Sequence, residues 1–251
     1  LPQGEPQLET MARWTWRYCA THVQRSLFDD QVNSGPSKIK DYVQVRMAAA
    51  REAIMQKYES NVLGTHVSAE TGTEIQGLND VVAPQSGYTT GTYGAIARSN
   101  PWWQSKYKQF TAPVEVNLLD DMKNLFNTVS NNQEPPNLII CDQDTFEVYE
   151  QFALDQTQLV KETDTRLADL GYDVLRFKGK RMIWTNNVQI SSTRQLLMLN
   201  TNYIKVIYDP MMWFDMTGWK DVPGQAERIA HILSAMNIIT NSPRRHGRLY
   251  A

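Results

Sequence analysis

The sequence predicts an α+β protein, and three patterns lead to that prediction. A single long helical pattern runs from Ser37 to Gly64, and an alternating aromatic pattern typical of a strand comes before it. Two shorter helices and a group of short strands follow in the second half of the chain. Helices and strands in this mixed order are expected to pack as layers around a sheet.

The composition is that of a folded protein without a strong electrostatic preference. The 251 residues are 41% hydrophobic and 21% charged, which suits one large domain or two small ones. The net charge of -2 lacks the Lys/Arg excess that proteins use to wrap nucleic acid. No apolar run approaches the roughly 18 residues of a membrane span, so no membrane partner is predicted. Cys19 and Cys141 lie far apart and are expected to be free thiols.

A long strand is predicted from Thr10 to Leu27, where aromatic and basic side chains alternate with the two-residue period of a strand. We expect this strand to project and to pack on something outside its own domain. An ordinary edge strand of the main sheet is the alternative. The candidate contact residues are Arg13, Trp14, Trp16, Arg17 and Tyr18.

From Ser37 to Gly64, apolar residues recur at steps of three and four, which places them on one stripe of a helix. They are Ile39, Val43, Met47, Ala50, Ile54, Tyr58 and Val62. Ser37 can cap the first amide groups, and Gly64 lies where helices commonly end. Nothing on the helix is typical of a catalytic site, so we expect a structural strut.

The following stretch of about fifty residues has too many helix breakers for a helix and too many aromatic residues for a disordered linker. We expect an ordered, irregular segment that lies over the fold and is anchored by Trp102 and Trp103, two further contact candidates. Its glycines match neither the dinucleotide fingerprint nor the phosphate-binding loop, so no cofactor is predicted.

Two helices flank a short buried strand, Leu138 to Cys141. We expect Asn117 to cap the first helix, and Asp144 with Glu147 to form a capping-box start for the second. The buried face of the first helix is expected to carry Leu118, Leu119, Met122, Leu125, Phe126 and Val129.

Short strands dominate the rest of the chain. Residues 173–177 and 182–184 read as a hairpin around Lys178 and Gly179, and residues 196–199 and 203–208 as two more strands. The segment from Met211 to Trp219 carries three Met, two Trp and a Phe, and is expected to be either an interface or a loop folded onto its own core. Its contact candidates are Met211, Met212 and Trp213. The spacing of the apolar residues from Ile229 to Ile239 fits a helix and a strand about equally well. Arg244 and Arg245, with His246 and Arg248, are expected to form a basic patch that is either solvated or an inter-chain contact surface.

No catalytic, cofactor-binding or metal-binding residue stands out, so an enzyme is not predicted. The four histidines lie in unrelated contexts, and no Gly-x-Ser-x-Gly motif occurs. Two alternatives remain open: a metal-dependent hydrolase that uses Asp142, Asp144 and Glu147, and a nucleic-acid-binding module that uses Arg13 and Arg17. For the acidic cluster a capping role is favoured over a metal site.

An ordered series of segments resembles the major capsid proteins of tailed double-stranded DNA bacteriophages. The series consists of WTWRY, VQRSLFDDQVNSG, GLNDVVAP, SNPWW, NLIICDQDTFEVYEQF, RLADLGYDVLRFKGKRMIWTNN, LLMLNTNYIKV and NSPRRHGRLY, and it spans residues 10 to 251. The resemblance implies the Hong Kong 97-like capsid fold, with a long spine helix, a peripheral domain, an axial domain and an extended loop.

The resemblance also assigns parts of the chain to these domains. Residues 1–33 would be the return strand of the extended loop, residues 34–116 the peripheral domain with the spine helix, and residues 117–204 the axial domain. Residues 205–251 would return to the peripheral domain, with the ambiguous final segment as a long strand. The family has an N-terminal arm and a first loop strand before this point, so we expect that region to be cleaved or to lie outside this numbering.

The function implied is structural and not enzymatic. Copies of the chain would form hexamers and pentamers of an icosahedral shell, and the aromatic, Met and Arg candidates above would be inter-subunit contacts. The shell would enclose double-stranded DNA without sequence-specific binding. Further partners would be portal, scaffold or decoration proteins. The location implied is the virion, with assembly in the host cytoplasm. Because the strand from Thr10 to Leu27 contains no Lys, covalent crosslinking is not carried over.

Overall fold

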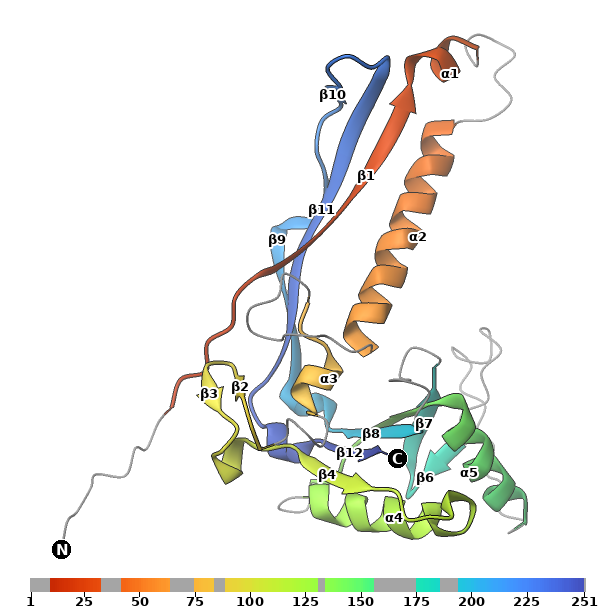
Figure 1. Ribbon diagram of the computed structural model, residues 1–251, viewed down its shortest axis with the longest axis vertical. Coiled ribbons are helices and arrows are strands. Elements are labelled where there is room, and N and C mark those ends of the chain that lie inside the picture. The colour runs from red at the N-terminus through yellow and green to blue at the C-terminus, as the bar shows by residue number, and fades with distance from the viewer. Residues whose placement is uncertain are drawn as a thin grey trace, which may run out of the picture.

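The computed structural model describes residues 10–32, 42–63, 75–83, 89–130, 134–155, 175–185 and 194–250. Figure 1 shows an elongated molecule with a long four-stranded sheet in its upper part and a six-stranded sheet at its lower end. Within the described residues, no helix is both long enough and apolar enough to cross a membrane.

The long sheet is antiparallel and is organised around one central strand. The central strand β11 (Glu227–Thr240) pairs on one side with β1 (Arg17–Ser26) over ten residues in continuous register. On the other side it pairs with β9 (Ile204–Met216) and the short β10 (Lys220–Asp221). The last apolar segment, for which the sequence fitted helix and strand alike, is therefore a strand.

Helix α2 (Tyr42–Leu63) runs beside β1, and the short helix α1 (Leu27–Val32) lies at the tip of the molecule (Figure 1). Ala50, Ile54 and Tyr58 are buried in one cluster with Val23 of β1 and Ile232 of β11. This confirms the long helix and its apolar stripe where the structure describes them. The predicted cap Ser37, the first stripe residue Ile39 and the predicted stop Gly64 lie outside the described residues.

A compact irregular segment joins the two sheets. It contains helix α3 (Leu78–Val81), the hairpin of β2 (Thr92–Tyr93) and β3 (Ile96–Ala97), and the 3-10 helix η1 (Pro101–Trp103). At Gly77 a side chain would place its Cβ 2.3 Å from the carbonyl oxygen of Asn61, so only glycine allows this approach to α2. The described part of this segment is ordered, as predicted.

The six-stranded sheet has the order β4-β12-β8-β5-β7-β6 and is mixed, because β12 with β4 and β5 with β7 are parallel pairs. Helices α4 (Val114–Val129) and α5 (Gln143–Asp155) pack against it. Leu196, Met198 and Leu249 of the sheet join Met122 and Leu125 of α4 in one fully buried core. The strands are β4 (Lys106–Gln109), β5 (Leu138–Cys141), β6 (Leu175–Phe177), β7 (Lys180–Trp184), β8 (Gln195–Leu199) and β12 (Gly247–Tyr250).

The predicted domain boundaries differ from this arrangement. Strand β4 falls in the range assigned to the peripheral domain, and β12 in the range assigned to its return, yet both belong to the six-stranded sheet. The boundaries at residues 116 and 205 therefore divide one sheet. The physical reason is that β12 is held between β4 and β8, so its place depends on long-range pairing that no local pattern records.

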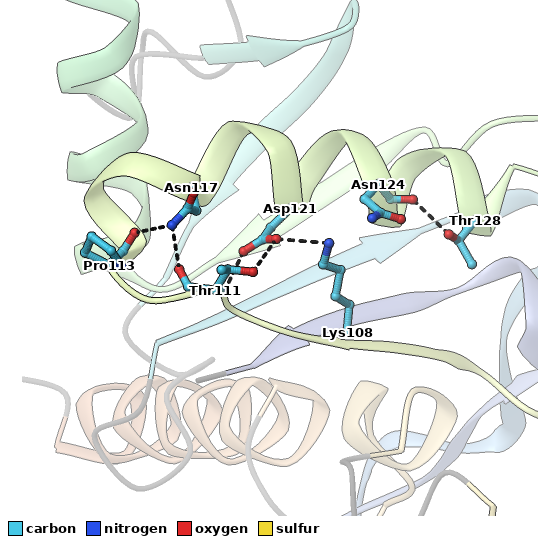
Figure 2. Close-up of polar contacts among 7 residues, drawn as sticks. All are labelled: Lys108, Thr111, Pro113, Asn117, Asp121, Asn124 and Thr128. Atoms are coloured by element: carbon cyan, nitrogen blue, oxygen red, sulfur yellow. Dashed lines mark hydrogen bonds and ion pairs between the residues drawn. The ribbon is translucent and has the colours of Figure 1, made fainter.

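Both predicted helix caps were wrong by a few residues. Helix α4 begins at Val114 after Pro113, so Asn117 lies within the helix and its side-chain amide donates to the carbonyls of Thr111 and Pro113 (Figure 2). Helix α5 is capped by Asp142 and not by Asp144, because the Asp142 carboxylate accepts from the backbone and hydroxyl of Thr145.

Candidate inter-subunit contact surface

Strand β9 exposes the largest group of apolar side chains in the described part of the long sheet. Its pairing with β11 shifts register twice, and Phe214 has a left-handed backbone with a φ of 54°. This irregularity turns Phe214 inward, where its ring packs 5.8 Å from that of Tyr58, and leaves Met211 86% exposed. Trp213 is also exposed and packs against Tyr208 with the two rings tilted by 45° and their centroids 4.9 Å apart.

The segment from Met211 to Trp219 fits both predicted alternatives in part, because Phe214, Met216 and Trp219 pack against the buried cluster whereas Met211 and Trp213 are exposed. Met212 is half-buried, whereas its two neighbours face solvent. A contiguous group of large exposed apolar side chains is typical of a surface that contacts another protein. The contact itself stays a prediction.

The N-terminal aromatic residues divide into two groups. Tyr18 is 61% exposed and Trp16 is also exposed, whereas the intervening Arg17 is buried. Trp14 is half-buried against the β2–β3 hairpin, with its ring 6.1 Å from that of Tyr93.

The strand therefore differs from its prediction in two ways. Residues 17–26 form an edge strand of the long sheet, which was the alternative, and do not project from it. Arg17 and Trp14 are engaged within the chain, because strand alternation turns Arg17 inward and the hairpin covers Trp14. Arg13 is exposed, and its backbone N–H donates to Gly94. Trp16 and Tyr18 stay contact candidates.

The tryptophan pair shows the same division. Trp103 is only 5% exposed, and its indole N–H donates to the Tyr93 carbonyl at 2.8 Å, so it is a core residue and not a contact. Trp102 is exposed and packs on one side against Trp103. The buried side chain of Trp103 anchors the segment, as predicted. The exposed side chain of Trp102 does not.

The predicted basic surface near the C-terminal end is not a surface. Arg244 is exposed, but Arg245 is buried in an ion pair with Glu134 and stacks 4.2 Å above the ring of Tyr203. Arg248 is fully buried and donates to the Asn79 side chain. Burial lowers the pKa of Arg248 to about 10. Arg245 therefore fixes the connection between β11 and β12 to Glu134 and Tyr203, and Arg248 fixes β12 to α3. The sequence pattern showed only the charge of these residues.

His246 lies at the point where the chain crosses between the two sheets. Its Nδ1 accepts from the backbone N–H of Asn200 at 3.2 Å, so the neutral ring carries its proton on Nε2 and donates to Thr240 Oγ1 at 3.0 Å. Burial, with a smaller effect of Arg245, lowers the pKa of His246 to about 3. Asn200 follows β8 and Thr240 ends β11, so the ring joins the two crossing segments.

Asn79 of α3 links helix α2 to the six-stranded sheet. Its amide donates to the Leu63 carbonyl at the end of α2, and its oxygen accepts from Gln195 of β8 as well as from Arg248 of β12. Sequence reasoning missed this role. The available signal was a pair of polar residues, Asn79 and Asp80, inside an otherwise apolar run.

Polar contacts join helix α4 to β4 and to the segment that follows β4, as Figure 2 shows. The buried carboxylate of Asp121 accepts from the backbone and hydroxyl of Thr111 and from Lys108, the last at 3.0 Å. Burial alone would raise the pKa of Asp121, but these donors outweigh it and hold the pKa below its usual value. Asn124 and Thr128 are joined on the exposed side of the same helix.

Further exposed apolar residues were not among the predicted contacts. Those in the described part of the chain are Met11, Leu27, Phe28, Val45, Met55, Val116, Val206, Ile207 and Tyr208. Most of them lie on α1, on α2 and on strand β9 of the long sheet. Those on helices are isolated and carry no pattern of their own, and Val206, Ile207 and Tyr208 belong to a run that indicated only a strand.

The geometry does not favour either chemical alternative. Among the described residues, no three His, Cys, Asp or Glu side chains are grouped to hold a metal ion. Asp142 is fully buried and saturated by Thr145 and the Gln195 backbone, so the acidic cluster is a cap and a strand link. Cys141 is a buried free thiol whose pKa is raised well above its usual value by burial, which disfavours a nucleophilic role. A nucleic-acid platform would need Arg17 exposed.

Comparisons with known proteins give a fold but no sequence family. No family model and no curated protein matches the chain. Solved structures do match over almost its full length. The encapsulin SrpI of Synechococcus elongatus PCC 7942 matches with a TM-score of 0.64 at 11% identity. The match covers 94% of this chain and 74% of the encapsulin chain.

Two phage capsids also match, one with the same TM-score as the encapsulin and one with a lower score. The cyanophage A-1(L) capsid has a TM-score of 0.64 at 17% identity, covering 93% of this chain and 76% of its own. The capsid of Myoviridae phage XM1 matches with a TM-score of 0.56 at 7% identity. The match covers 94% of this chain and 73% of the phage chain. The chain therefore has the Hong Kong 97-like capsid fold, as predicted from its sequence.

Proposed function

We propose that this chain is the major capsid protein of a tailed bacteriophage, and that many copies form the icosahedral shell of the phage head around double-stranded DNA. The observation that carries the proposal is the shared fold: phage capsids match more than nine-tenths of the chain. The exposed apolar side chains of β9 and β1 supply the surfaces that such a shell subunit needs.

The contact residues follow from the exposure of their side chains. Met211 and Trp213 of β9 contact one neighbour, and Trp16 and Tyr18 contact another, because one patch on each side of β11 gives the heterologous contacts that close rings. Hexamers and pentamers are the rings expected. The chain has a structural and not a catalytic role, and any portal, scaffold or decoration protein would bind the assembled shell.

Particle formation by the purified protein tests the shell function. Electron microscopy and light scattering should show closed particles or rings, since the exposed patches are satisfied only by neighbouring copies. A monodisperse monomer that stays unassociated at high concentration, with or without a co-expressed scaffold, would contradict the proposal.

An encapsulin-type shell is the second candidate, because the Synechococcus encapsulin and the cyanophage capsid match with the same TM-score. The contents of particles purified from the native source separate the two. A phage head should contain double-stranded DNA that resists nuclease until the shell is opened. Particles free of nucleic acid would favour the encapsulin-type shell.

A further inference from the structure

The face of the long sheet opposite α2 carries two histidines on neighbouring strands. His22 of β1 lies directly opposite His231 of β11 in the antiparallel register. Both side chains are exposed, whereas Val23, Ala230 and Ile232, the adjacent residues along these strands, are buried. Because successive side chains alternate between faces, the two imidazoles share the solvent-facing side.

The backbone shows which kind of cross-strand pair this is. The N–H of His231 donates to Thr217 Oγ1 and its carbonyl accepts from the Thr217 N–H, both at 2.8 Å. Both groups therefore point away from β1. The same alternation places the Gln24 carbonyl on the free edge of β1, where Arg46 donates to it. His22 and His231 are consequently a non-hydrogen-bonded pair, in which opposite Cα atoms are about 4.5 Å apart and the side chains are closest.

This geometry suits a bidentate metal site. Opposite Cβ atoms in such a pair are about 4.5–5.5 Å apart. Two imidazole nitrogens on one tetrahedral Zn²⁺ are about 3.3 Å apart at metal–nitrogen distances near 2.0–2.1 Å, so the rings need only converge slightly. Along the two strands the same-face neighbours Ala20, Gln24, Ile229 and Leu233 carry no charge. On the other side of β11, Lys220 lies opposite Ile229 and Asp215 opposite Leu233, so the charges next to the pair on this face are of opposite sign.

We propose that His22 and His231 bind one divalent transition-metal ion of the imidazole-preferring class, such as Zn²⁺, and that the ion joins β1 to β11. Water completes the coordination shell, since no third His, Cys, Asp or Glu of the described residues joins the pair. The proposal is independent of shell assembly. His246 cannot take part, because both its ring nitrogens are already engaged.

Calorimetric titration of the full-length protein with ZnCl₂ at pH 7.5, in a buffer that does not bind metal, tests the site. The wild-type chain should bind one ion per copy. His22→Gln and His231→Gln should each weaken binding about tenfold or more, because the second ligand acts at a high effective concentration only while both are present. The double variant should bind little more weakly than either single variant, and millimolar MgCl₂ should not compete.

His66→Gln, which removes a histidine outside the described residues, is the control and should keep the wild-type affinity. The thermal midpoint of the wild-type protein should rise with Zn²⁺ and return with EDTA, while the two single variants show no rise, because the ion joins strands only in the folded state. Should a Gln variant misfold by circular dichroism, His22→Asn and His231→Asn replace it. Binding unchanged by the substitutions, additive losses, or no binding by the wild-type chain would overturn the proposal.

Discussion

The two sheets of this molecule differ in how completely they bury their own side chains. In the six-stranded sheet every residue of β8 is buried, and α4 closes one face with an apolar core and the Asp121 contacts. In the long sheet, β9 is exposed or half-buried along its entire length and β1 exposes Tyr18. One face of the lower sheet is closed by its own helices, and on the other face Leu197 and Leu199 of β8 are buried in the cluster shared with α2 and β11. The upper part, in addition, has apolar surface left to bury.

This difference indicates that the upper part of the subunit is the part whose apolar surface is buried on assembly. A substitution in the lower core should change the free energy of unfolding of the unassembled chain. A substitution on the exposed faces of the long sheet should leave that free energy almost unchanged and act on assembly. The comparison can be tested with pairs of identical substitutions, one in each region.

The largest effect is expected from Met122→Ala in α4. Met122 is fully buried, so the truncation leaves a cavity and should lower the free energy of unfolding by about 2–5 kcal/mol. Urea unfolding of the unassembled chain measures it. Met211→Ala removes the same atoms from a side chain that is 86% exposed and should change stability by less than about 0.5 kcal/mol. Equal losses in the two variants would mean that the two regions do not differ.

A somewhat smaller effect is expected where β12 packs under α4. An added Cβ at Gly247 would lie 2.5 Å from Val129 Cγ2 and 2.9 Å from Leu125 Cδ1, so Gly247→Ala should cost about 1–3 kcal/mol in chemical unfolding. Gly218 lies in the long sheet's connection, where a Cβ meets nothing within 4 Å. Gly218→Ala should therefore be near neutral, and a loss as large as that of Gly247→Ala would refute the packing argument.

The link between the sheets should respond to acid. Burial lowers the pKa of His246 from an ordinary 6.5 to about 3. Between pH 6.5 and pH 3 the imidazole is therefore protonated in the unfolded chain and neutral in the folded chain. Above pH 6.5 the imidazole is neutral in both states, so His246 does not lower the free energy of unfolding. As the pH drops from 6.5 toward 3, the free energy of unfolding falls by about 1.4 kcal/mol per pH unit. Unfolding free energies measured from pH 7 to 4 should show this slope, and His246→Asn should flatten it.

Local elements were predictable because each follows from a short-range rule. Helix α2 follows from its apolar spacing, β5 from an apolar run, and the β6–β7 hairpin from a turn in which Lys178 and Gly179 both have positive φ. The long strand β11 could not be separated from a helix by spacing, and only the family resemblance decided for the strand.

Long-range pairing and burial were not predictable from local patterns. The position of β12 between two distant strands, and the burial of Arg248 and His246 within an Arg-rich segment, depend on partners such as Asn79 and Asn200 elsewhere in the chain. The contact candidates divided for the same reason. An exposed aromatic residue such as Tyr18 and a buried one such as Trp103 lie in equally aromatic stretches, and only the tertiary packing separates them.

The smallest effect on the unassembled chain, and the sharpest test of the comparison, is expected from Tyr18→Ser. Tyr18 lies on the solvent face of β1, so its removal should change the free energy of unfolding by less than about 0.5 kcal/mol. Assembly followed by light scattering should nevertheless be lost or strongly slowed, because an aromatic contact would be missing from every copy. Gln24→Ser on the same strand face is the control and should assemble normally. A Tyr18→Ser protein that assembles like the wild type would remove this face from the contact surface and leave β9 as the part of the long sheet that neighbours cover.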